Sequence, residues 1–174
     1  MTEDARLNMG DWSYVEAAEG WLELGNLREA NEELVKIASD LRSHPRVLGL
    51  RWKMHALVHE WDACVEIARE MVQARPGESE GWLNLATSVQ RLGRGQEAKD
   101  ILLSVVKAFE LDAAIPFDLA RYCGGLGQVR EAKQWLGKAL LAAKDTEEVQ
   151  RLRKLALEDP ALEPLRTPTL TLAK

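Results

Sequence analysis

The sequence of residues 82–102 is WLNLATSVQRLGRGQEAKDIL, two stretches of helical pattern separated by a glycine. The small and apolar residues on each side fall three or four positions apart, which places them on one face of a helix. Gly93 lies between the two stretches, and glycine tolerates the left-handed backbone of a tight turn. The sequence therefore predicts a helical hairpin, with helices over about 79–91 and 95–109.

The same pattern recurs along the chain at an interval of 34 residues. The turn column holds Gly25, His59, Gly93 and Gly127, and four columns of small or apolar residues accompany it: Ala30, Cys64, Ala98 and Ala132; Leu34, Ala68, Leu102 and Leu136; Ile37, Met71, Val105 and Ala139; Ala18, Trp52, Ala86 and Ala120. A fixed period of this length is typical of stacked helical units, each too small to bury its apolar face alone.

The period divides the chain into a lead-in and four helix pairs. The lead-in covers residues 1–10, and the pairs cover about 11–44, 45–78, 79–112 and 113–144. The second pair departs most from the pattern, because His59 replaces the turn glycine and Arg51 replaces an apolar residue. Neighbouring Trp52 is expected to fill the volume that Arg51 leaves.

A further helix is predicted over residues 145–159. Asp145 stands at a capping position, Glu148 follows three residues later as in a capping box, and an apolar stripe comes next. A solenoid needs such a helix to cover its last repeat. Residues 160–174 contain three prolines and have little to pack against, so we expect them to be extended or disordered.

The composition is that of an ordinary globular protein, with 46% apolar and 29% charged residues among 174. The net charge is −5 and the basic residues are interspersed with acidic ones, which argues against nucleic acid as a partner. The sequence predicts neither a membrane span nor an export signal. Cys64 and Cys123 replace small or apolar residues of the repeat, so we expect buried free thiols and a reducing, cytoplasmic location.

Residues 82–89, followed by Gly93, Ala98 and Leu102, resemble the tetratricopeptide repeat (TPR). The resemblance covers about residues 11–143. It implies an all-α, right-handed α-solenoid of four TPR helix pairs with a C-terminal capping helix. It also implies a concave groove, lined by the first helix of each pair, that binds a segment of another protein.

The first helices predict which side chains line that groove, because residues that do not point into the stack face the inner wall. We expect the groove to receive Trp12, Val15, Glu19, Lys53, Leu83, Asn84, Thr87, Arg91, Phe117 and Arg121. Apolar members would act as anchors and polar members as selectors of a protein or peptide ligand. The cations Lys53, Arg91 and Arg121 could attract an acidic segment or could equally be solvated arginines and lysine balanced by nearby acids.

One TPR subfamily grips a terminal carboxylate with Lys, Asn and Arg residues from three consecutive units. At the matching positions this chain has Gly49 and Lys53, then Asn84, then Ala114 and Asp118. Two of the required cations are missing, so this carboxylate clamp is not predicted.

Residues that could carry chemistry do not form a catalytic or ligand-binding set. His55 and His59 lie four apart, but no third zinc ligand is placed and Glu does not follow the first His directly. The glycine pattern of residues 93–98 follows a helix rather than a strand, so it is a turn and not a dinucleotide loop. We therefore expect no enzyme activity, cofactor or metal.

The function predicted from the sequence is that of a non-catalytic protein–protein interaction scaffold. Two alternatives remain. Trp12 lies at the N-terminal end, where no earlier repeat covers the first pair, so the chain could self-associate as a homodimer through that end. Alternatively, an acidic and compact protein of this kind could be a small secretion-type chaperone.

Overall fold

The computed structural model describes residues 9–166, and this part of the chain contains helices and no strand. It divides between Asn84 and Leu85 into two compact units. The predicted all-α class is confirmed. Residues 1–8 of the expected lead-in and residues 167–174 of the expected tail lie outside the described residues.

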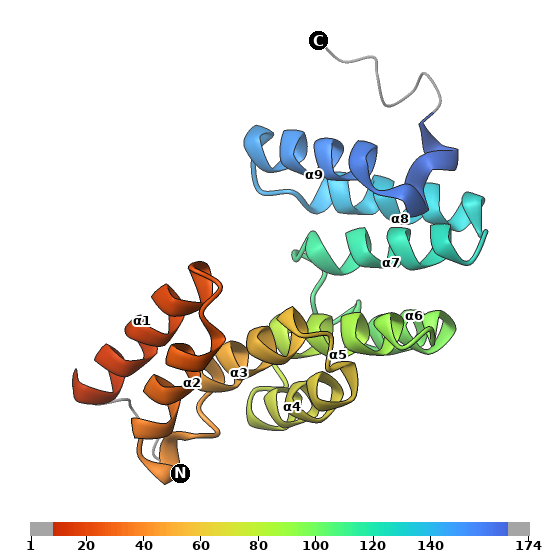
Figure 1. The fold of residues 1–174 in the computed structure, drawn as a ribbon. Helices are drawn as coiled ribbons and strands as arrows, with labels where there is room; N and C mark the ends of the chain where they lie inside the picture. Colours follow the sequence, from red (N-terminus) through yellow and green to blue (C-terminus); the bar gives the residue numbers. More distant parts are fainter. Residues whose placement is uncertain (1–8, 167–174) are drawn as a thin grey trace. The chain divides into compact units, whose positions relative to one another are not determined.

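The first unit consists of helical hairpins (Figure 1). Its elements are α1 (Met9–Glu23), α2 (Leu27–Lys36), the short 3₁₀ helix η1 (Ser39–Leu41), α3 (Pro45–Leu57) and α4 (Trp61–Ala74), followed by α5 (Ser79–Arg91), which continues into the second unit. Helix α1 pairs with α2, α3 pairs with α4, and α1 also contacts α3. The core between them contains Val15, Ala18, Leu34, Ile37, Leu41, Val47 and Leu50.

The second unit continues with α6 (Gly95–Val105), α7 (Ala114–Gly125), α8 (Val129–Ala142), α9 (Thr146–Glu158) and the 3₁₀ helix η2 (Pro160–Leu165). Helix α7 contacts α6 and pairs with α8, while α9 packs on α8. The η2 segment contacts α7, α8 and α9.

The four predicted turns share one backbone geometry. The residues of the turn column have left-handed φ values: +72° at Gly25, +60° at His59, +80° at Gly93 and +73° at Gly127. In each turn two backbone amides donate hydrogen bonds to carbonyls of the preceding helix. The donor and acceptor residues are Asn26 to Trp21 and Gly25 to Leu22; Glu60 to His55 and His59 to Ala56; Arg94 to Val89 and Gly93 to Gln90; Gln128 to Cys123 and Gly127 to Gly124. This pair of bonds is the Schellman motif, which satisfies carbonyls at the helix C-terminus while the chain reverses.

The small residues five positions after each turn are fully removed from solvent. Ala30, Cys64, Ala98 and Ala132 are all 0% exposed. Of the Ala18 column, the three alanines are equally buried, whereas Trp52 remains half-buried. A tryptophan is too large for a position built around a methyl group, so Trp52 packs only in part, against Leu48, Ile67 and Met71.

The predicted capping helix is present as α9. The Asp145 side chain accepts a hydrogen bond from the Glu148 amide at 2.8 Å, as an N-cap residue does. Glu148 reaches back to the amide of Lys144 at 2.8 Å, one residue before the cap. The inner side of α9 buries Leu152 and Ala156.

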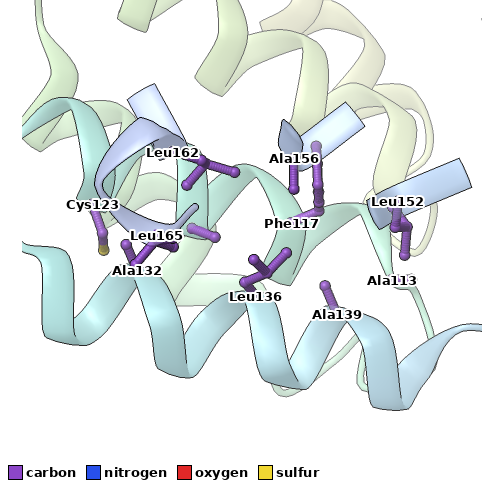
Figure 2. Packing of buried hydrophobic residues seen from close by; sticks show 11 residues of the cluster. Ala113, Phe117, Cys123, Ala132, Leu136, Ala139, Leu152, Ala156, Leu162 and Leu165 are labelled. Atoms are coloured by element: carbon purple, nitrogen blue, oxygen red, sulfur yellow. The ribbon is translucent and has the colours of Figure 1, made fainter. Parts of the chain in front are cut away.

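The expectation of an extended or disordered stretch from residue 160 is wrong for residues 160–166. The η2 helix begins after Asp159, whose side chain caps it by accepting from the Ala161 amide. Leu162 and Leu165 are buried with Cys123, Ala132 and Leu136 (Figure 2). Through these two leucines the short segment packs on α7 and α8.

Helix α6 ends at Val105, before the expected end at residue 109, and α2 ends at Lys36. Helix α2 ends at Lys36 because Ile37 turns to an extended backbone, and the next amide, Ala38, donates to Asp11 Oδ1 at 3.3 Å. After α6, the Ala108 amide bonds to Val105, three residues back, in place of a continued α-helical ladder. Both endings lie at the connections to the next helix pair.

A buried lysine joins α6 to the segment that begins α8, and no sequence pattern predicted it. Lys99 Nζ donates to Gln128 Oε1 at 2.7 Å and to Glu131 Oε2 at 2.6 Å. Its side chain is only 8% exposed, so these partners satisfy an ammonium group that is largely removed from water.

The left-handed turn of the second pair predicts a stabilising substitution. A left-handed backbone costs a residue with a side chain roughly 1–2 kcal/mol, part of which is offset because glycine loses more entropy on folding. We expect His59→Gly to raise the free energy of unfolding by about 0.5–1 kcal/mol in urea denaturation. Gly93→Ala is the converse and should lower it by about 1 kcal/mol. A less stable His59→Gly protein would contradict the proposed strain at this turn.

Candidate functional site

The ten residues of the predicted groove divide between the two compact units. Trp12, Val15, Glu19, Lys53, Leu83 and Asn84 belong to the first unit, and Thr87, Arg91, Phe117 and Arg121 belong to the second.

In the first unit, Val15 is not available to a ligand. Its side chain is 0% exposed and packs in the core with Ala18, Leu34 and Ile37. The prediction for Val15 is therefore wrong. The reason is that α1 contacts both α2 and α3, so the face expected to be open is shared between two helices.

An open pocket of about 380 Å³ lies between α1 and α3. Its lining includes two of the predicted residues, Glu19 and Lys53, and its full lining is Glu19, Leu22, Glu23, Leu50, Trp52, Lys53, Ala56 and Leu57. Leu57 is 55% exposed, although it is a large apolar side chain. The pocket thus offers apolar surface to a ligand and carries charges along it.

Glu19 connects the charges of this pocket. Its Oε2 accepts from Arg46 Nη2 at 3.0 Å, and its Oε1 lies 3.9 Å from Lys53 Nζ. The side chains of Arg46 and Lys53 are more than half exposed, so each pair contributes at most about 1 kcal/mol to stability. These ion pairs hold the carboxylate in place but leave both cations accessible to a partner's acidic groups.

Trp52 was not among the residues predicted for this site. It stands in a repeat column whose other members are alanine. This difference in side-chain size is the feature of the sequence that could have indicated its role. A side chain too large for a buried column must reach the surface, and Trp52 lines the pocket. Amphipathic aromatic side chains of this kind are common anchors at protein interfaces.

The remaining predicted residues of the first unit differ in exposure. Trp12 is 40% exposed near the start of α1. Leu83 and Asn84 are half-buried on α5, and the Asn84 amide donates to Met71 Sδ at 3.6 Å.

In the second unit, the predicted residues of α7 are covered by the chain's own C-terminal elements. Phe117 is 8% exposed and lies in one cluster with Leu152, Ala156 and Leu162 (Figure 2). The prediction that Phe117 is an open groove residue is therefore wrong. Helix α9 and η2 occupy the surface that a ligand would need.

Arg121 is held by two carboxylates. Its Nε donates to Asp159 Oδ2 at 2.5 Å, and its Nη1 donates to Asp118 Oδ1 at 2.8 Å. Burial raises the pKa of the Asp118 carboxyl, and the adjacent Arg121 guanidinium opposes that shift. Because its charge is matched, Arg121 is not an open cation for an acidic ligand.

Thr87 and Arg91 lie nearby on α5. The Thr87 hydroxyl lies 3.5 Å from the hydroxyl of Tyr122, whose pKa is raised by burial. Arg91 is exposed and lines a second pocket of about 490 Å³, to which Arg121, Tyr122 and Asp159 also contribute. Of the predicted cations, this pocket thus brings Arg91 and Arg121 together.

The histidines considered as zinc ligands have other surroundings. His55 Nδ1 lies 2.6 Å from Glu60 Oε2, and the His59 ring lies 5.7 Å from that of Trp61. In residues 9–166, no group of three or more His, Cys, Asp or Glu side chains is arranged to hold a metal ion. No helix in the same range has the length and apolar character needed to cross a bilayer.

The two cysteines are free and buried, as expected from their place in the repeat. Burial raises the pKa of the Cys64 thiol to about 11. The pKa of Cys123 is also raised by burial.

These thiols should therefore be unreactive while the protein is folded. We expect Ellman's reagent at pH 8 to modify both at least roughly a hundredfold more slowly than free cysteine, because little thiolate forms and access is blocked. Modification should reach the rate of free cysteine in denaturant. Fast labelling of the native protein would contradict the buried positions.

No protein-family model matches the sequence, and no curated protein matches it significantly. Solved structures are nevertheless similar in fold. Residues 41 to the end of MamA from Desulfovibrio magneticus RS-1 align with a TM-score of 0.64 and 17% identity, covering 91% of this chain and 90% of that one. A Podosopora anserina protein of kinesin light chain type, with nearly identical TPR-like repeats, aligns with a TM-score of 0.63 and 20% identity, covering 98% and 92%.

These likenesses establish the fold as the TPR type of helical solenoid. At this level of identity they say nothing of the ligand, because one scaffold hosts many unrelated functions.

Proposed function

We propose that this protein is a non-catalytic scaffold that binds a segment of another protein, and that the α1–α3 pocket of the first unit is its contact site. The observation that carries the proposal is the open pocket with Trp52 and Leu57 on its wall and the Glu19 ion pairs beside them. Folds of the TPR type commonly bind other proteins, and this supports a protein-binding function. The four-repeat division at residues 11–44, 45–78, 79–112 and 113–144 is part of the same proposal.

The pocket indicates what the bound segment would contain. An aliphatic or aromatic side chain would contact Leu22, Trp52 and Leu57, since burying such surface drives association. An acidic residue beside it would meet Lys53 and Arg46, which are accessible although paired with Glu19. A segment of alternating apolar and acidic character therefore fits best.

The test compares proteins captured from the source cells by three forms of the chain. Lys53→Glu with Leu57→Glu changes two exposed pocket residues, so it should leave the fold intact and reduce capture of the specific partner at least tenfold. Lys133→Glu with Leu141→Glu makes the same changes on exposed positions of α8 and should not affect capture. Quantitative mass spectrometry provides the measurement, and circular dichroism checks folding.

Equal capture by the wild type and the pocket variant would refute the assignment of the pocket. Capture of many unfolded proteins by all three forms would instead favour the chaperone alternative.

Self-association is a second candidate function, favoured by the 40% exposure of Trp12. If the N-terminal end forms a homodimer, light scattering should report a mass that rises with concentration, and Trp12→Ser should abolish that rise. A monomer at all concentrations would eliminate this candidate.

The free thiols Cys64 and Cys123 support the proposal of a reducing, cytoplasmic location.

A further inference from the structure

The segment Asp159–Leu165 lies on α7 in the manner of a bound peptide. One side of it faces the protein, where Leu162 and Leu165 are buried and Asp159 pairs with Arg121. The opposite side is exposed and carries Pro160, Glu163 and Pro164. A core element is normally surrounded, whereas this segment is buried along a single edge.

The spacing of the three inward residues follows from the helix type. A 3₁₀ helix has three residues per turn, so side chains three apart point in the same direction. Asp159, Leu162 and Leu165 are three apart and so form one edge. The pattern that α7 and α8 contact is therefore an acidic residue with leucine at the third and sixth positions after it.

The surface that receives this edge has a matching feature for each residue. Arg121, which Asp118 holds in position, binds the Asp159 carboxylate. The leucines enter an apolar site formed by Cys123, Ala132 and Leu136 (Figure 2). An arginine that is held in position by a carboxylate and lies beside an apolar site can recognise an acidic segment that contains leucine.

Gly124 fixes how closely the segment can approach. A Cβ atom at this position would overlap the backbone carbonyl of Ala161. At the adjacent Gly125, the same addition meets no atom within 4 Å. Comparing substitutions at Gly124 and Gly125 thus distinguishes a clash with the segment from any general effect of adding a methyl group to α7.

The backbone bonds of the segment are local. The Leu162 amide bonds to Asp159 and the Arg166 amide bonds to Glu163. The Arg166 guanidinium also donates to the Asp159 carbonyl at 3.2 Å. Because the short helix carries its own hydrogen bonds, it can leave the surface without breaking the helices beneath it.

We propose that this α7 surface is a peptide-recognition site, and that Asp159–Leu165 is a built-in competitor that occupies it in the free protein. The partner is a segment of another protein with an acidic residue and large aliphatic side chains three and six residues later. Such a segment displaces residues 159–165 and takes their contacts. This surface is in the second unit, so its test is independent of the α1–α3 pocket.

The first experiment measures binding of a fluorescent peptide with the sequence of residues 158–166, EDPALEPLR, by anisotropy. In the full chain, Leu162→Ala with Leu165→Ala weakens the internal segment, and we expect this variant to bind the peptide at least tenfold more tightly than wild type does. A peptide carrying Leu162→Asp should not bind. Equal affinities, or no binding by a variant that circular dichroism shows to be folded, would overturn the proposal.

Replacing each of the two glycines by alanine locates the bound peptide. In the double-leucine variant, Gly124→Ala should reduce peptide affinity at least tenfold, because the new methyl group blocks the backbone. Gly125→Ala should leave the affinity unchanged. Equal effects of the two substitutions would place the peptide elsewhere and overturn the assignment to α7.

Hydrogen exchange of the wild-type protein decides the question if the leucine variant does not fold. We expect the hydrogen-bonded amides of Ala161, Leu162 and Arg166 to exchange through a local opening that is insensitive to low denaturant, at least a hundredfold faster than amides of α8. Exchange at the rate of α8, with the same denaturant dependence, would show that the segment opens only on global unfolding. That result would overturn its role as a displaceable competitor.

Discussion

The left-handed turn between paired helices is the constraint on which the rest of the structure depends. At Gly25 and its equivalents a positive φ reverses the chain, and two amides bond back to the helix that has just ended. The reversal brings the next helix close enough that only a small side chain fits five residues later. Ala30 and its equivalents provide that side chain, and each is fully buried. Turn and close contact therefore recur together at the same period.

Stacked pairs of this kind leave a face uncovered at the end of an array, and the chain resolves this problem in its second unit with its own residues. Helix α9 packs on α8, and η2 packs on α7 and α8 with Leu162 and the Arg121–Asp159 ion pair. In the first unit the α1–α3 pocket stays open. The protein therefore combines an accessible surface with one that is occupied in the free state, which is the basis of both binding proposals.

The helices, their turns and the buried columns could be predicted because each is a local pattern repeated at a constant interval. The site residues could not be predicted equally well. Val15 and Phe117 occupy positions that the repeat pattern leaves undetermined, since their burial depends on α3 in one case and on α9 and η2 in the other. The η2 segment was missed because two leucines three apart are too short a pattern to predict a helix, and Pro164 suggested irregular chain. Lys99 was missed because its partners lie about 30 residues away.

Through-hydrogen-bond couplings measured by NMR test the turn most directly, together with backbone φ values from three-bond couplings. Positive φ is predicted at residues 25, 59, 93 and 127, with couplings from the amides of Asn26, Glu60, Arg94 and Gln128 to carbonyls five residues earlier. A negative φ at any of these positions, or a continuous helical ladder through it, would contradict the repeated hairpin on which the account rests.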